Sequence, residues 1–117
     1  MGKRKNNNMK KLILLVIVAL AVSAAATYAG EAKAIYEKQC AKCHGPDGKG
    51  QTKMGQKLEI KDFSDAKYQA GLKDEAMTKA IKEGIKDKEG KLRMKPAEGV
   101  SDEEVKGLIT LIREFKK

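Results

Sequence analysis

The chain has 117 residues, of which 25 are basic and 16 acidic, and it contains two cysteines, one histidine and no tryptophan. This length suffices for one domain and no more. Basic and acidic residues are mixed along the sequence, and no basic run is interleaved with aromatic residues, which argues against nucleic-acid binding.

Residues 1–29 predict a secretory signal peptide. Residues 1–11 carry five basic and no acidic side chains, residues 12–26 are apolar except for Ser23, and residues 27–29 place small side chains where a signal peptidase cleaves. Cleavage after Ala29 would leave a domain of residues 30–117 with a net charge of +4. The alternative is a retained membrane anchor. The apolar run is shorter than the ~20 residues that span a bilayer, but it nearly reaches that length if it extends to Gly30.

The domain of residues 30–117 is poor in large core side chains. Small exported domains commonly rely on disulfides. The only two cysteines are separated by two residues, so a bond between them would close too short a loop to stabilise much. We therefore expect something other than a disulfide to complete the core.

The first predicted helix of this domain ends at a glycine-rich segment. Apolar and small residues recur at helical spacing before it, which predicts that both thiols lie on the inward face. Gly45 to Gly50 contains three glycines and a proline, a density that ends a helix. The predicted inward face consists of Ala32, Ile35, Tyr36, Gln39, Cys40 and Cys43.

A second helix is predicted over residues 75–83. Asp74 is its expected N-cap, and Gly84 is its expected left-handed stop. A shorter helical turn is predicted over residues 64–70, ended in the same way by Gly71.

The third predicted helix has the clearest start. Ser101 to Glu104 matches a capping box, with acidic residues where the helix dipole favours them. Residues 86–100 before it are predicted to form a polar loop, and no segment has a convincing strand pattern. The predicted fold class is therefore all-α, with three main helices. The apolar face of the third helix consists of Val105, Leu108, Ile109, Ile112 and Phe115.

The segment Cys40-Ala41-Lys42-Cys43-His44 carries the chemistry. Two thiols at this spacing can add to the two vinyl groups of haem, and the adjacent imidazole then reaches the iron from the same side. The pattern is a haem-attachment signal. Because it uses both cysteines and the only histidine of the chain, we predict one covalently bound haem c.

Three other interpretations explain this segment less well. A structural zinc site needs about four ligands, and no partner pair exists elsewhere. A thioredoxin-like redox dithiol needs a strand before the motif, and none is predicted. A plain disulfide leaves His44 without a role.

The second axial ligand of the iron must come from outside the motif, and the candidates are three methionines. Met77 lies on the apolar stripe of a helix, where methionine usually fills the core. Met54 lies in a lysine- and glycine-rich loop, ten residues after His44. Met94 lies in a loop held by Pro96, and loops between rigid elements commonly carry function. Met94 is therefore favoured.

Two segments resemble class I cytochromes c, the small monohaem type. Residues 35–50 resemble the opening of that family, and residues 93–96 with 100–105 resemble its axial-methionine loop and last helix. The resemblance spans residues 31–117. Two positions depart from it: Ala32 stands where the family often has glycine, at the crossing of the first and last helices, and Leu111 stands where it often has an aromatic residue.

The resemblance implies a cytochrome c fold, with three main helices around one haem. Cys40 and Cys43 would hold the porphyrin, and His44 and Met94 would be the axial iron ligands. With both axial positions filled, no position is open for a substrate, so we expect a monomeric one-electron carrier and not an enzyme. The alternatives are a haem sensor or catalytic haem protein with an open sixth position, and the cytochrome subunit of a membrane redox complex.

The expected partners are redox proteins with acidic docking surfaces, in the periplasm or elsewhere outside the cytoplasm. A membrane is expected as a partner only if the N-terminal segment is retained. Basic residues flank both haem-binding segments and could ring an exposed haem edge; the alternative is a solvated surface with no docking role. These residues are Lys38, Lys42, Lys49, Lys53, Lys88, Lys91, Arg93 and Lys95.

Overall fold

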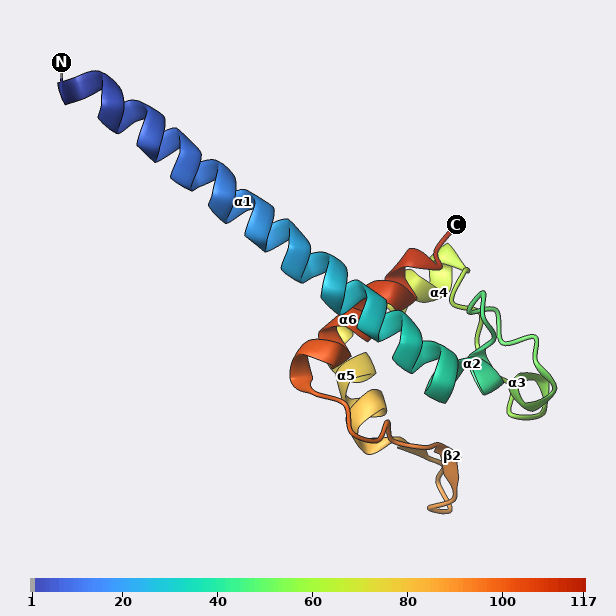
Figure 1. Ribbon diagram of the computed structural model, residues 1–117. Helices are drawn as coiled ribbons and strands as arrows, with labels where there is room; N and C mark the ends of the chain where they lie inside the picture. Colours follow the sequence, from blue (N-terminus) through green and yellow to red (C-terminus); the bar gives the residue numbers. More distant parts are fainter. Residues whose placement is uncertain (1) are drawn as a thin grey trace.

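The computed structural model describes the backbone of residues 2–117 and the side chains of residues 7–18 and 29–117. Most of this chain is helical (Figure 1), as predicted. The elements are α1 (Gly2–Ile35), the π-helical turn η1 (Tyr36–Cys40), α2 (Ala41–His44), α3 (Lys53–Lys57), α4 (Ala66–Gly71), α5 (Asp74–Glu83), β1 (Ile85–Lys86), β2 (Leu92–Met94) and α6 (Asp102–Glu114).

The molecule consists of a compact helical part and the long first half of α1, which extends away from it (Figure 1). Its extents are 76 × 29 × 23 Å. The predicted cleavage point after Ala29 lies within α1, and the side chains of residues 19–28 in the predicted signal peptide lie outside the described residues. Among the residues described, no helix is long and apolar enough to cross a membrane.

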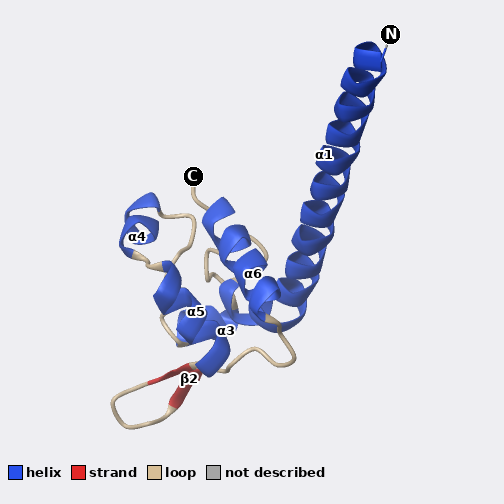
Figure 2. Cartoon of the chain, turned by 90° about the vertical axis from the view of Figure 1, so that its left-hand side faces the viewer, coloured by secondary structure: helices blue, strands red, loops and turns tan. Residues whose placement is uncertain are grey.

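The core forms where the C-terminal end of α1 packs against α6 (Figures 1 and 2). Ala32 is 1% exposed at this contact, and Leu111 is half-buried against the same cluster. The predicted start of α6 is confirmed: Glu104 N donates to Ser101 Oγ (3.2 Å), and Ser101 N donates to Glu104 Oε2 (2.8 Å). The buried apolar side chains are Ala32, Tyr36, Phe63, Met77, Ile81, Val105, Leu108, Ile109 and Ile112.

Two predicted helix boundaries were wrong. Lys73, and not Asp74, is the N-cap of α5, because the Asp74 carboxylate instead accepts from Arg113 Nη2 (2.7 Å). Gly71 is the last residue of α4 and has no positive φ, since that helix ends when Leu72 turns to extended backbone. The predicted stop at Gly84 is confirmed by its position after α5 and its φ of 74°.

The expectation that the chain has no strand was also wrong. β1 and β2 pair antiparallel, with Ile85 opposite Met94, and form a small hairpin at one end of the molecule (Figure 2). The strands have two and three residues, too few to show alternation in the sequence. Asp87 closes the turn by accepting hydrogen bonds from the backbone N–H groups of Glu89 (3.0 Å) and Lys91 (2.9 Å).

A buried amide connects the segment before α4 to α6. Gln69 is 4% exposed, and its Nε2 donates to the carbonyl oxygens of Phe63 and Ile112, both at 2.8 Å. Arg113 Nη1 donates in return to Gln69 Oε1 (2.9 Å). Because all of these partners are present, the buried amide costs little and fixes the position of Phe63.

Candidate functional site

The predicted haem-attachment segment, residues 40–44, begins at the end of a π-helical turn. The backbone N–H of Ala41 donates to the carbonyl of Tyr36, five residues earlier, which widens this turn relative to an α-helix. Cys40 ends the turn, and Cys43 and His44 form the end of α2. The first helix is therefore not a continuous α-helix as predicted, and both thiols are half-buried and unpaired.

Burial controls the protonation of the site. It raises the pKa of the Cys40 thiol to about 11, with a further contribution from the neighbouring Cys43. Burial also lowers the pKa of His44 below its ordinary value of 6.5. At neutral pH the site therefore holds a protonated Cys40 thiol and a neutral imidazole, the form of histidine that binds metals.

His44 lies against Phe63, with ring centroids 4.8 Å apart and planes inclined by 15°. Its Nδ1 atom is buried and finds no hydrogen-bond partner among the residues that the structure describes. Two free thiols beside a neutral, incompletely hydrogen-bonded imidazole fit covalent haem with a histidine ligand. In the described part of the chain, no group of three or more His, Cys, Asp and Glu side chains is arranged to hold a metal ion.

The loop after the motif folds back onto it through three hydrogen bonds. The Tyr36 hydroxyl donates to the carbonyl of Gly45 (2.7 Å), and burial raises the pKa of this phenol well above its ordinary value. The Thr52 hydroxyl donates to the carbonyl of Cys43 (2.7 Å), and Gly50 N donates to the carbonyl of His44 (2.8 Å). The motif is therefore held from both sides by its own flanking segments.

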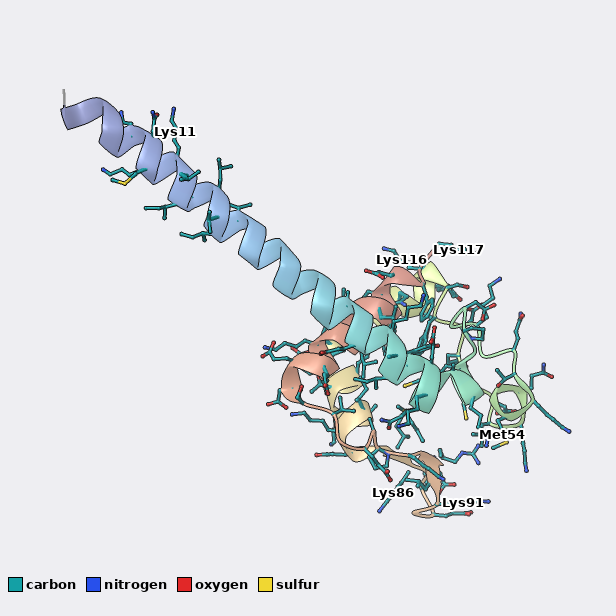
Figure 3. All side chains as sticks on the ribbon, viewed as in Figure 1. Lys11, Met54, Lys86, Lys91, Lys116 and Lys117 are labelled. Atoms are coloured by element: carbon teal, nitrogen blue, oxygen red, sulfur yellow. The ribbon has the colours of Figure 1, made fainter. Side chains whose placement is uncertain are left out.

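The three candidate methionines lie in different environments. Met77 is 5% exposed in the core, as predicted for a packing residue, whereas Met54 on α3 is 37% exposed (Figure 3). Met94 is half-buried on β2 and packs against the same core cluster as Cys40. Gly84 allows the backbone of Met94 to lie this close to α5, since a Cβ on Gly84 would lie 2.4 Å from the Met94 carbonyl oxygen.

Sequence analysis missed two neighbours of the site. Phe63 stacks on His44 from nineteen residues away, and no local pattern signals such a contact. Thr52 caps α3 and holds Cys43; its place one residue before that helix is an N-cap signal that could have been recognised.

Comparisons with known proteins agree with these features. The family described as cytochrome C oxidase, cbb3-type, subunit III matches residues 28–112. A solved structure titled KustC0563 c-type cytochrome is 38% identical, with a TM-score of 0.62, over 73% of this chain and 96% of that one. A second, of a Kustc0563 mutant, is 36% identical with a TM-score of 0.61, over 74% of this chain and 99% of that one. No curated protein matches the chain.

Proposed function

We propose a function that follows from the family of this chain. The chain belongs to the small c-type cytochromes, because a family model matches residues 28–112 and a solved c-type cytochrome is 38% identical in sequence. Membership implies a covalently bound haem c and, in general, electron transport. We propose that the chain is a one-electron carrier with histidine and methionine axial ligands, working outside the cytoplasm as a monomer.

The main observation behind the proposal is that the motif presents two free thiols and a neutral imidazole. Cys40 and Cys43 are free, close in sequence and half-buried, so both are available to hold the porphyrin through thioether bonds. Burial keeps His44 neutral, and Phe63 fixes the plane of its ring, which prepares the imidazole to bind iron. When bound there, haem supplies a one-electron iron couple.

We assign Met94 as the second axial ligand. Met77 fills the core, and Met54 is more exposed than Met94. The hairpin holds the Met94 backbone against Gly84, so this side chain comes from a fixed segment. A soft thioether favours reduced iron, which raises the reduction potential relative to a second imidazole.

Filling both axial positions supports an electron carrier over the rival function, a haem sensor or catalytic haem protein with an open position. Electrons would then pass between this chain and partner proteins, with no substrate bound to the iron. Basic residues around the two haem-binding segments support partners with acidic surfaces: seven of the eight named above are exposed, and Lys49 is half-buried.

The test is an optical spectrum of the haem-loaded protein and of its Met94→Ala variant. We expect the oxidised wild-type protein to show the weak sulfur-to-iron absorption band at the red end of the spectrum. Met94→Ala should abolish this band, lower the reduction potential and let carbon monoxide bind the reduced iron.

Met54→Ala and Met77→Ala are the matched controls and should keep the band. Loss of the band in either control but not in Met94→Ala would contradict the ligand assignment. Carbon monoxide binding by the wild-type protein would favour the open-site function instead.

A further inference from the structure

A pair of hydrogen bonds joins the cysteine segment to the loop that follows Met94. Gln39 Nε2 donates to the carbonyl of Glu98 (3.0 Å), and Glu98 N donates to Gln39 Oε1 (2.9 Å). Gln39 directly precedes Cys40, and Glu98 lies four residues after Met94. One side-chain amide thus pairs with both backbone polar groups of a residue 59 positions away; we call this pair the Gln39 clasp.

The Gln39 clasp is a direct polar connection between the segments of the motif and of Met94. Within the side chains and backbone that the structure describes, no other hydrogen bond connects residues 32–57, which contain the motif, with residues 84–101, which contain Met94. The other anchors of residues 94–97 lead to α5 and its following strand. Ala97 N donates to the carbonyl of Ile81 (2.8 Å), and Met94 pairs with Ile85.

The segment of Met94 is therefore held by two separate sets of contacts, one with α5 and one with the motif. The anchors on α5 connect the segment of Met94 to α5, and not directly to the segment of His44. The clasp makes that direct connection, because Gln39 is held in the π-helical turn that leads into the motif. A planar amide that both donates to and accepts from one residue also restricts the relative orientation of the two joined segments more than a single hydrogen bond does.

We propose that Gln39 is a positioning residue that sets the spacing between the segment carrying His44 and the segment carrying Met94 at the end of β2. The proposal rests on the proposed function, because this spacing matters only if both side chains bind the same iron. Loss of the clasp would let the loop move away from the motif and make the Met94–iron bond easier to displace.

The test compares Gln39→Leu with wild type in the full-length, haem-loaded protein. Leucine removes both hydrogen bonds without adding a new iron ligand. We expect imidazole to bind the oxidised iron about tenfold more tightly in Gln39→Leu, a change equivalent to about 1.4 kcal/mol. Gln56→Leu is the matched control, since Gln56 Nε2 donates only to the carbonyl of nearby Gln51 (3.3 Å), and its imidazole affinity should be unchanged.

Hydrogen exchange of the Glu98 amide is a second readout that does not depend on the iron. It should be at least about tenfold faster in Gln39→Leu and unchanged in Gln56→Leu, because only the first variant removes the acceptor of this N–H. Unchanged exchange would show that the clasp is not formed in solution. Faster exchange with unchanged imidazole affinity would show that the clasp has no positioning role. Either result overturns the proposal.

Met94→Ala distinguishes failure of this inference from failure of the proposed function. If Met94 is the ligand, Met94→Ala should raise imidazole affinity more than Gln39→Leu, and adding Gln39→Leu to it should have no further effect. If Met94→Ala leaves the affinity unchanged, the ligand assignment is wrong and the positioning role is overturned with it, even where Glu98 exchange shows the clasp.

Discussion

Single residues in the site differ from their ordinary states because they are buried. Both Cys40, with a pKa raised to about 11, and His44, with a lowered pKa, favour the neutral form of the side chain. Neutral groups suit a site that receives a large apolar ring, since no charge has to be desolvated when the ring packs. Among the described residues, the buried Nδ1 atom of His44 has no hydrogen-bond partner.

The first prediction concerns the two thiols. Protein matured in a host that attaches haem should retain it through acid–acetone extraction and show a mass increase of one haem. Cys40→Ser and Cys43→Ser should each keep the haem through the remaining thioether bond, whereas the double variant should release it. Haem that extracts freely from the wild-type protein would refute covalent attachment.

Among the elements, the short helix α3 is packed unusually tightly against α2. Gly55 lies in α3 where a Cβ would come within 2.3 Å of the Gly50 carbonyl oxygen and 2.5 Å of the Cys43 carbonyl oxygen. Both neighbours are backbone atoms, which cannot rotate away as a side chain would. The Cys43 carbonyl also accepts from the Thr52 hydroxyl, so the same close contact supports the motif.

We therefore predict that Gly55→Ala destabilises the protein by about 3 kcal/mol, because the α2–α3 contact must open. Chemical denaturation of the haem-loaded protein measures this change. Gly71→Ala is the control: no atom lies within 4 Å of its added Cβ, and its stability should be unchanged or slightly higher. Equal stability of Gly55→Ala and wild type would disprove the close packing.

The start of α6 is joined to α5 by an ion pair between Asp102 and Lys82. The hydrogen bond from Lys82, and then its positive charge, hold the pKa of Asp102 below its usual range. A lowered folded-state pKa means that the contribution to stability is present above the ordinary carboxyl pKa and is lost as pH falls through the folded pKa. The pair is exposed, so this contribution is small.

Asp102→Asn should accordingly lower Tm slightly at pH 7, and the difference from wild type should shrink below about pH 4. Thermal unfolding at both pH values tests this expectation. Lys82→Met should remove the same contribution, so that the double variant is no less stable than either single variant. A Tm difference that persists in full well below about pH 4 would point to a cause other than the carboxylate charge.

In the whole molecule, two pairs of lysines lie at separate ends of the compact part (Figure 3). Lys86 and Lys91 lie on the hairpin, whereas Lys116 and Lys117 lie at the C-terminus, away from it (Figure 3). Complementary charge mainly raises the rate of encounter between redox partners. A docking role therefore requires that lysines near the haem-binding segments matter more than lysines at the C-terminus.

Electron transfer with an acidic redox protein should slow steeply as salt rises from ~0.01 to ~0.15 M, because the screening length shortens from ~30 to ~8 Å. Lys42→Glu and Lys95→Glu should slow it further at low salt. Lys116→Glu and Lys117→Glu carry the same change of charge outside the two haem-binding segments and should have a smaller effect. Stopped-flow rates that respond equally to both pairs would indicate net charge alone, without a docking surface.

Local patterns in the sequence were sufficient to predict the last helix and the attachment motif of this protein. The capping box at Ser101 and the apolar face of α6 are visible within a short window, and both were predicted correctly because capping and amphipathicity are local properties. The attachment motif is also local: two thiols and an imidazole within five residues can be recognised without any knowledge of the fold.

Tertiary structure decided the features that depend on contacts between distant segments. The stacking of Phe63 on His44 and the Gln39 clasp on Glu98 join residues 19 and 59 positions apart, so no sequence window contains both partners. Asp74 failed as an N-cap for the same reason, because Arg113 from α6 competes for its carboxylate. The hairpin was missed because its strands are held by their place between α5 and α6 and not by strand propensity.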